Sequence, residues 1–515
     1  MLTRTTISSA ACAIVSLITL AACSSPQSAA SAAREKPAAT RAPEILGALV
    51  TLDGDTAEWP ANVTLASDEH HTYVRFNPPG EIYTLQSANK TTSILFDVDN
   101  NPATGMRPAT GSDAVRALGV DLEVAFSHPR NDNNGKRVFG RGVVMFAYDA
   151  AGNRQPVNRE DWDFAAAPTY ASDWYEARIS RTPSGPVIIP AQGLLSSGML
   201  AGAVVTRDLD GAITTSGDIF RGKLPEHCMT GSRKSNMRVP AKADGAYRVV
   251  SYNVLRSAPE AKPEIYSRIF KALDADVYLF QEWEYSSNEA LATWFNTNVG
   301  GTWHAAGLPG TVRENKGVAV VSKYPVELVT PYLKVHPDGQ RDPSNVRFAG
   351  VRVDVPGPDI IASSVHLKSA GSNGSPEDLR RIAEARAIVE TLDTLDNEPG
   401  TITIIGGDYN LVGSRTPLEI LMTKTDTDGS DKSIADAMTL GDRTFTTWTE
   451  AGNPFGPGRL DWMVYSDSTA KATRSFVLDS SRLTDDSLQR AGLQATDTAQ
   501  ASDHLPVVVD LQPVR

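Results

Sequence analysis

The sequence predicts two domains of different fold class, an all-β sandwich followed by a mixed α/β domain whose sheets carry helices on the outside. Three observations support this. Short β-rich runs separated by Gly, Asn, Asp and Pro fill residues 44–229, strands alternate with helices in residues 246–515, and 515 residues suffice for two or three domains. The composition, 41% hydrophobic and 21% charged, is ordinary for a globular protein.

The N-terminal segment has the features of a secretory signal. Arg4 precedes an apolar stretch, residues 7–22, that is too short for a transmembrane helix. The run 20–23, Leu-Ala-Ala-Cys, resembles a bacterial lipobox, which implies cleavage before Cys23 and lipid attachment to its sulfur. We therefore expect a signal peptide at 1–22, an Ala-, Ser- and Pro-rich tether at 23–43, and a membrane anchor in the bacterial cell envelope, at the outer membrane or cell surface.

The predicted sandwich, residues 44–229, has no long amphipathic helix. Its expected strands include Ser93–Phe96, Leu122–Phe126, Val143–Tyr148 and Trp174–Ile179. Three stretches, 52–60, 96–105 and 175–179, resemble the family 9 carbohydrate-binding module. The resemblance implies a jelly-roll sandwich with a structural Ca²⁺ ion and a polysaccharide partner. Asp97, Asp99 and Asn101 alternate as calcium-loop ligands do, although an Asx-rich turn has the same pattern.

The α/β domain, residues 246–515, follows a polar, basic linker at 230–245. Apolar runs predict strands at 247–252, 277–280, 317–322, 360–365, 401–405, 460–465 and 507–511. One predicted helix is Pro263–Leu273. A second, Pro376–Leu395, starts with Ser375 as N-cap.

Polar residues collect at the ends of these strands. Two glycines, Gly406 and Gly407, are expected to break the strand 401–405, and Asp408 and Asn410 follow two residues apart, facing one spot in an extended segment. Each such residue alone has an ordinary structural explanation, but eight in one domain are difficult to attribute to chance. They are Asn253, Glu282, His366, Asp408, Asn410, Asp461, Asp503 and His504.

The order of these motifs resembles the endonuclease/exonuclease/phosphatase superfamily. The matching runs are 251–253 (Ser-Tyr-Asn), 281–282 (Gln-Glu), 317–325, 364–368 (Ser-Val-His-Leu-Lys), 407–410 (Gly-Asp-Tyr-Asn), 459–462 (Arg-Leu-Asp-Trp) and 502–506 (Ser-Asp-His-Leu-Pro). The resemblance implies a four-layer α/β/β/α sandwich and metal-dependent hydrolysis of a phosphate ester. A phosphodiester repels hydroxide, and a hard cation on carboxylate oxygens removes that repulsion.

The resemblance also implies roles for single residues. Glu282, Asn253 and Asp503 are expected to hold Mg²⁺ (or Mn²⁺). His504, with Asp461 fixing its tautomer, and Asp408 are both candidates for the general base, and the choice stays open. Further roles fall to Asn410 as an oxyanion donor, His366 as a phosphoryl contact or proton donor, Lys368 as a phosphate contact and Asn315 as a residue that orients His366.

The net charge of −12 argues against tight binding of duplex DNA. The first prediction is a nuclease-like phosphodiesterase whose substrate is nucleic acid or a phospholipid head group. Alternatives are a phospholipase or sphingomyelinase, a phosphomonoesterase, and, from another class, a surface carbohydrate-binding protein with an inactive catalytic scaffold. The two domains are expected to work separately, so that removal of residues 44–228 leaves catalysis intact.

The lipobox generates the first testable prediction. Cys23→Ala removes the sulfur that carries the lipid. The variant is expected to leave the membrane fraction and appear in the soluble fraction, as followed by ultracentrifugation and immunoblotting. Cys228→Ala is the matched control. Unchanged membrane fractionation of Cys23→Ala would count against lipidation.

Overall fold

The computed structural model describes residues 46–47, 50–185, 187–189, 198–225, 234–337 and 342–514. The predicted signal peptide, Cys23, the tether and Cys228 lie outside the described residues. Residues Ala42–Arg515 form one compact unit. Among the described residues, no helix combines the length and the apolar character needed to cross a membrane.

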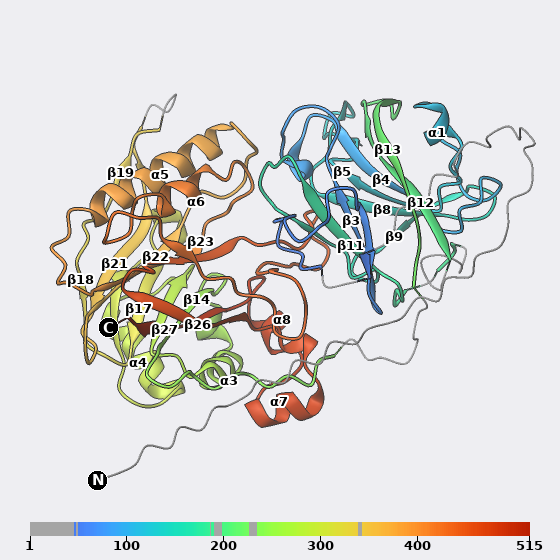
Figure 1. The fold of residues 1–515 in the computed structure, drawn as a ribbon. Helices are drawn as coiled ribbons and strands as arrows, with labels where there is room; N and C mark the ends of the chain where they lie inside the picture. Colours follow the sequence, from blue (N-terminus) through green and yellow to red (C-terminus); the bar gives the residue numbers. More distant parts are fainter. Residues whose placement is uncertain are drawn as a thin grey trace, which may run out of the picture. The chain divides into compact units, whose positions relative to one another are not determined.

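The described residues between 46 and 223 form two β-sheets packed face to face, as predicted (Figure 1). The first sheet has the order β1 (Leu46–Gly47), β2 (Leu65–Ser67), β3 (His71–Phe76), β11 (Tyr175–Ser180), β10 (Ala165–Ala167). The second has the order β13 (Ile213–Lys223), β12 (Met199–Arg207), β4 (Thr91–Asp97), β5 (Leu122–Phe126), β8 (Val143–Tyr148), β9 (Arg154–Val157). Val74 and Tyr175 of one sheet share a core with Phe96 and Val124 of the other. The smaller elements are a hairpin, β6 (Arg130–Asn131) and β7 (Arg137–Val138), η1 (Leu85–Ser87) and α1 (Asp113–Arg116).

The C-terminal part contains two six-stranded sheets. One has the order β16 (His304–Leu308), β17 (Val318–Ser322), β15 (Val277–Gln281), β14 (Tyr247–Asn253), β27 (Val507–Pro513), β26 (Ala470–Val477). The other has the order β18 (Val326–Leu328), β21 (Arg347–Val353), β22 (Ile360–His366), β23 (Ile402–Asp408), β25 (Asp461–Tyr465), β24 (Ser433–Ile434). A short pair, β19 (Lys334–Val335) and β20 (Ser344–Asn345), stands apart.

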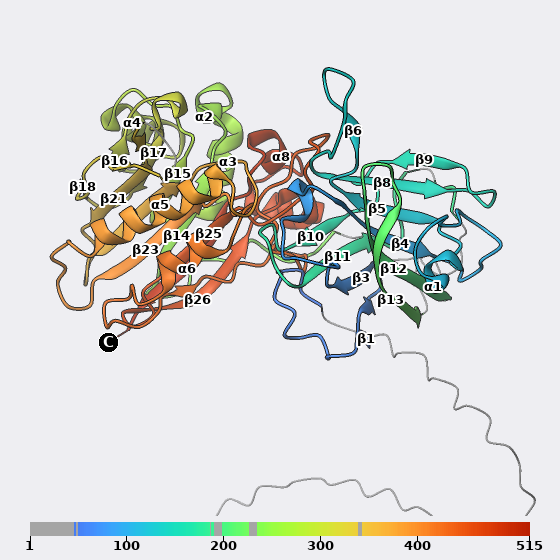
Figure 2. The same cartoon turned by 90° about the horizontal axis from the view of Figure 1, so that it is seen from above.

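Helices cover the outer faces of both sheets, visible in Figures 1 and 2. They are α2 (Ala258–Ala261), α3 (Pro263–Leu273), α4 (Asn288–Asn298), α5 (Pro376–Leu392), α6 (Thr416–Met422), α7 (Asp485–Ala491) and α8 (Asp497–Ala501), with the short turns η2 (Val312–Glu314) and η3 (Ser480–Arg482). Helix α5 ends three residues before the predicted end, and Ser375 caps it by accepting from the Asp378 N–H.

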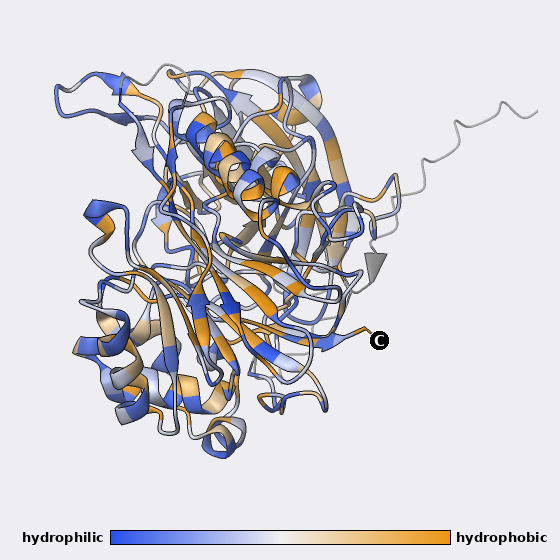
Figure 3. Ribbon diagram, turned by 90° about the vertical axis from the view of Figure 1, so that its left-hand side faces the viewer, coloured by the Kyte–Doolittle hydropathy of each residue, from blue (hydrophilic) through white to orange (hydrophobic). Residues whose placement is uncertain are grey.

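Strand alternation explains the four layers. Along β15, Leu279 joins the core between the two sheets, whereas Phe280 joins the core beneath α3 and α4. Along β23, Ile404 faces the opposite sheet and Ile405 packs with Leu418 of α6. In Figure 3, many strands carry orange, hydrophobic stretches. The predicted α/β/β/α sandwich is confirmed.

Strand β23 differs from the prediction at its glycines. It continues through Gly406 and Gly407 to Asp408 instead of breaking at residue 405. A Cβ on Gly406 would lie 2.7 Å from Leu279 of the other sheet, and a Cβ on Gly407 would lie 1.8 Å from the Val365 carbonyl oxygen. Gly407 therefore permits close approach of the β22 backbone, and Gly406 leaves room for the Leu279 side chain.

The described part of the predicted linker, residues 234–245, packs on the C-terminal domain. Lys242 forms a 2.7 Å ion pair with Asp276, and the Ala243 N–H donates to Asp510. Large aromatic side chains mostly lie in the cores: Phe295 and Trp303 are buried, as is Trp162 of the sandwich. Trp174 is 37% exposed, with the Arg75 guanidinium 4.6 Å from its ring.

A buried ion network joins the two domains. Arg178 on β11 pairs with Asp442 at 2.6 Å, and Arg482 pairs with Asp163 of the sandwich at 2.7 Å. The Arg178 and Asp442 side chains are only 2% and 10% exposed. Burial opposes ionisation of Asp442, but Arg178 and Arg482 together lower its pKa to about 2.

Asp442→Asn leaves Arg178 buried with a weaker partner, Asp163 at 3.5 Å. We expect a loss of about 3 kcal/mol in the free energy of unfolding at pH 7, measured by urea denaturation. Because the native pKa lies below the ordinary 3.8, the folded state binds fewer protons, so this stabilisation is full above pH 4 and disappears as the pH falls through 2.

The difference between wild type and Asp442→Asn should therefore shrink toward pH 2. Asp436→Asn is the matched control, since Asp436 is 74% exposed and lies 3.9 Å from Arg459. Equal losses for both variants would contradict a special role of the buried network.

Candidate active site

Strand pairing brings the polar strand ends into one row. In the parallel pair β22–β23, His366 lies opposite Asp408, and in the antiparallel pair β23–β25, Asp408 lies opposite Asp461. In the facing sheet, Asn253 ends β14 opposite Gln281, and Glu282 follows directly. The register of each strand pair is fixed by its buried apolar residues, so the hydrophobic cores determine where the polar side chains lie.

One carboxylate oxygen, Asp408 Oδ2, lies at the centre of this row. It accepts a 3.2 Å hydrogen bond from Asn253 Nδ2 and lies 3.6 Å from His366 Nε2 and 3.7 Å from His504 Nε2. The other oxygen, Oδ1, accepts from the Asn410 N–H at 2.9 Å. Burial raises the pKa of Asp408; His504 opposes this rise, and the nearby carboxylates of Asp461 and Glu282 add to it.

His504 is held by Asp461. Its Nδ1 lies 2.7 Å from Asp461 Oδ2, which leaves Nε2 facing Asp408. Burial alone would lower the pKa of His504, but the carboxylates of Asp461 and Asp408, together with the hydrogen bond to Asp461, raise it. The imidazole is therefore oriented and favoured in its cationic form.

His366 is a contrasting histidine. Its Nε2 lies 3.7 Å from Glu282 Oε1, yet burial, Arg347 and His504 hold its pKa well below the usual value. Arg347 on β21 lies opposite His366 in the sheet and donates to the Leu367 carbonyl at 2.9 Å. The neutral imidazole thus lies beside a permanent guanidinium charge.

These residues line a cavity of about 350 Å³, which suits a small ligand. Its walls include Glu282, Arg347, His366, Asp408, Asn410, Asp503 and His504, together with Arg256, Val412, Trp448, Phe455 and Leu460. Trp448 Nε1 donates to Asp503 Oδ2 at 3.0 Å and fixes that carboxylate. All the predicted residues at the strand ends therefore belong to one site, with Asn253 and Asp461 just behind the cavity surface.

Lys368 and Asn315, two residues predicted to act at the site, do not line the cavity. Lys368 donates from Nζ to the Ser369 carbonyl, and Asn315 ends the turn η2 with φ +55°; neither is among the described residues that line the cavity. Asn410 lines it with φ +49°, so it reaches the cavity in a left-handed turn instead of the predicted extended segment.

The donor set fits a hard divalent cation. Glu282 and Asp503 are partly exposed carboxylates on the cavity wall, and Asn253 adds an amide whose Nδ2 donates to Glu282 Oε1 at 3.3 Å and whose Oδ1 accepts from the Leu255 N–H. Oxygen ligands of this kind suit Mg²⁺ or Mn²⁺, and Asn253 contributes no further negative charge.

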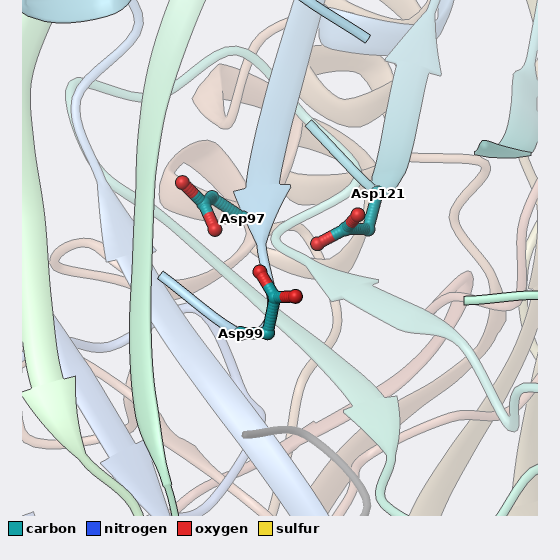
Figure 4. Close-up of side chains that lie close together, drawn as sticks. All are labelled: Asp97, Asp99 and Asp121. Carbon is teal, nitrogen blue, oxygen red and sulfur yellow. The ribbon is translucent and has the colours of Figure 1, made fainter. Parts of the chain in front are cut away.

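The sandwich contains a second cluster, shown in Figure 4. Ligand oxygens of Asp97, Asp99 and Asp121 all lie within 4.8 Å of one another. Asp121 is fully buried, and its Oδ1 has no hydrogen-bond partner. Burial, Asp99 and Asp97 raise its pKa to about 7, while a hydrogen bond from Val98 opposes them. Asn101 Oδ1 instead accepts from the Ala103 N–H.

Sequence reasoning missed several of these residues. Arg347 and Asp121 lie within or beside apolar strands where no local pattern distinguishes them. Trp448 lies in an irregular loop, and only its register with His504 places it at the site. The Arg-Leu-Asp-Trp run at 459–462 does not predict that Trp448 lies at the site.

Residues 250–504, just under half of the chain, match the model of the Endonuclease/Exonuclease/phosphatase family, and this match supports a phosphoester hydrolase. A search of curated proteins finds no match.

Solved structures similar to this chain include the human Nocturnin catalytic domain with bound sulfate (15% identity, 53% of this chain and 97% of that chain, TM-score 0.34). Another is a mannosyl-6-phosphatase of Bacteroides thetaiotaomicron (16% identity, 52% and 99%, TM-score 0.35). A third is the 3′ phosphatase NExo from Neisseria bound to a product DNA hairpin (16% identity, 51% and 98%, TM-score 0.34).

Proposed function

We propose that the C-terminal domain is a metal-dependent, nuclease-like phosphodiesterase. The position of Asp408 Oδ2 carries the proposal, because one buried carboxylate oxygen lies within 3.7 Å of two imidazoles and an amide on the wall of a ligand-sized cavity. Such a group can take a proton from a water molecule while the histidines contact phosphoryl oxygens.

Glu282, Asp503 and Asn253 would hold Mg²⁺ or Mn²⁺. When bound, such an ion neutralises the phosphate and stabilises the leaving alkoxide. Arg256 also lines the cavity, and its Nε lies 3.9 Å from Glu282 Oε2.

The two histidines divide the remaining work. His504, kept cationic by Asp461 and Asp408, binds a phosphoryl oxygen through Nε2–H and leaves the accepting of the water proton to Asp408 Oδ2. His366 is neutral and offers a hydrogen bond from Nε2, and Arg347 behind it supplies the positive charge. Asn410 closes the site on the side of Leu367, to which its Nδ2 donates at 3.2 Å.

We also propose that the chain is secreted and held in the cell envelope by lipid on Cys23, as the run 20–23 indicates. Its substrates would then be extracellular phosphodiesters, in nucleic acid or in phospholipid head groups.

The full chain should hydrolyse bis-p-nitrophenyl phosphate with Mg²⁺ and lose this activity with EDTA. His504→Ala removes the oriented imidazole and is expected to lower kcat by roughly 10²- to 10⁴-fold. His304→Ala is the matched control, since His304 on β16 is not among the described residues that line the cavity. Comparable turnover of both variants would contradict the assignment. Plasmid nicking and sphingomyelin hydrolysis, assayed in parallel, separate nuclease activity from lipase activity.

We further propose that Asp97, Asp99 and Asp121 hold a structural Ca²⁺ ion. The buried, unpartnered Asp121 Oδ1 supports it, because a buried carboxylate oxygen without a partner costs free energy that a cation would recover.

Ca²⁺ at 100 times its dissociation constant should stabilise the full chain by about 2.7 kcal/mol, measured as a rise in Tm over EGTA by scanning fluorimetry. Asp121→Asn should abolish the rise. Asp132→Asn, in an ordinary Asx turn of the same domain, should retain it. A calcium response that survives Asp121→Asn would exclude this site.

A further inference from the structure

The sandwich domain forms one wall of the catalytic cavity. Five of the lining residues come from it: Thr84, Gln86, Ser87, Arg141 and Thr169. The two domains, which we expected to work separately, therefore share the space in which a substrate would lie. The contacts that hold this wall in place are direct.

The first contact consists of hydrogen bonds from the sandwich to the residues that follow Asn410. Thr169 Oγ1 donates to the carbonyl of Leu411, the next residue, at 2.6 Å, and lies 3.2 Å from the Arg459 carbonyl oxygen. Two residues further on, the Ala171 N–H donates to the Gly413 carbonyl at 2.7 Å. The loop that carries Asn410 is thus hydrogen-bonded to the sandwich.

The second contact fixes the backbone beside Arg141. The Val143 N–H donates to the Pro454 carbonyl at 2.9 Å, and the Gly456 N–H donates to Gln86 Oε1 at 2.7 Å. Gly142 has φ +85°, and a Cβ there would lie 1.9 Å from the Pro454 carbonyl oxygen. The tight approach sets Arg141 at the cavity edge beside Phe455 and Gly456.

Three arginines line the cavity, and they differ in what they already bind. Arg347 is buried and donates to the Leu367 carbonyl, and Arg256 lies 3.9 Å from Glu282. Arg141 is exposed, and within the described parts of the chain no hydrogen bond or ion pair engages its guanidinium. Of the three, it is the arginine whose guanidinium has no partner among the described residues, which leaves it available for a ligand.

We propose that Arg141 binds a second anionic group of the substrate, so that the enzyme prefers compact phosphate esters that carry another phosphate or carboxylate beyond the scissile one. This rests on the proposed function and names its substrate class. A guanidinium pairs with phosphate through two parallel N–H···O bonds, which supply orientation as well as attraction. A cavity of about 350 Å³ accommodates a ligand of nucleotide size.

Two matched esters test this on the full chain. Thymidine 5′-(p-nitrophenyl phosphate) and its 3′-phosphorylated form release the same p-nitrophenol, and only the second carries another phosphate. We expect a KM roughly tenfold lower for the 3′-phosphorylated ester, because charge-assisted hydrogen bonds contribute about this factor.

Arg141→Ala should raise the KM of the 3′-phosphorylated ester roughly tenfold, with little change in kcat or in the KM of the other ester. Arg141→Lys should restore part of the preference, since it keeps the charge but loses the planar fork. Arg221→Ala removes one charge from β13 of the same domain and should change neither KM.

Equal KM values for the two esters, or equal effects of Arg141→Ala on both, would overturn this inference while metal-dependent turnover upheld the proposed function. Absence of metal-dependent hydrolysis of either ester would overturn both.

Discussion

The site depends on the buried carboxylate of Asp408. A charge that is 2% exposed is costly unless neighbours compensate it. Asn253 and the Asn410 N–H supply hydrogen bonds, and His504 supplies the opposite charge, which in turn requires Asp461. Each residue of the row therefore compensates the charge or the hydrogen-bonding capacity of another, and a buried cluster of this kind is typical of functional sites.

Backbone geometry imposes the second constraint. Asp408 reaches its place because β23 lies close to the facing sheet at Gly406, where a Cβ would lie 2.7 Å from Leu279 Cδ1, and close to β22 at Gly407, where a Cβ would lie 1.8 Å from the Val365 carbonyl oxygen. The sequence shows both glycines, but a strand break and a close backbone approach look alike in one dimension. Pairing of β23 with β22 and β25 distinguishes them, and that pairing is non-local.

Local sequence patterns predicted some features of the fold and the site, whereas features that depend on non-local pairing could not be predicted. Strand ends are marked by the change from apolar to polar residues, so the polar row and both layers of sheet could be read directly, as could α3 and α5. Arg347 and Asp121 give no such mark, since each lies among buried strands and acts through a neighbour distant in sequence. The domain interface was equally hidden, because 49 basic and 61 acidic residues offer many pairings and only folding selects Arg178 with Asp442.

That interface changes the electrostatic argument about substrates. A chain with net charge −12 repels an extended polyanion, so any attraction must come from local charge. The cavity supplies it with arginines from both domains: Arg256 and Arg347 from one, and Arg141 from the other. The net negative charge repels every phosphate of a long duplex, whereas a compact ester bound in the cavity interacts mainly with the charges that line it. On the proposed function, this charge distribution would favour small anionic esters over long duplexes, and Arg141 would contribute only while the sandwich stays in place.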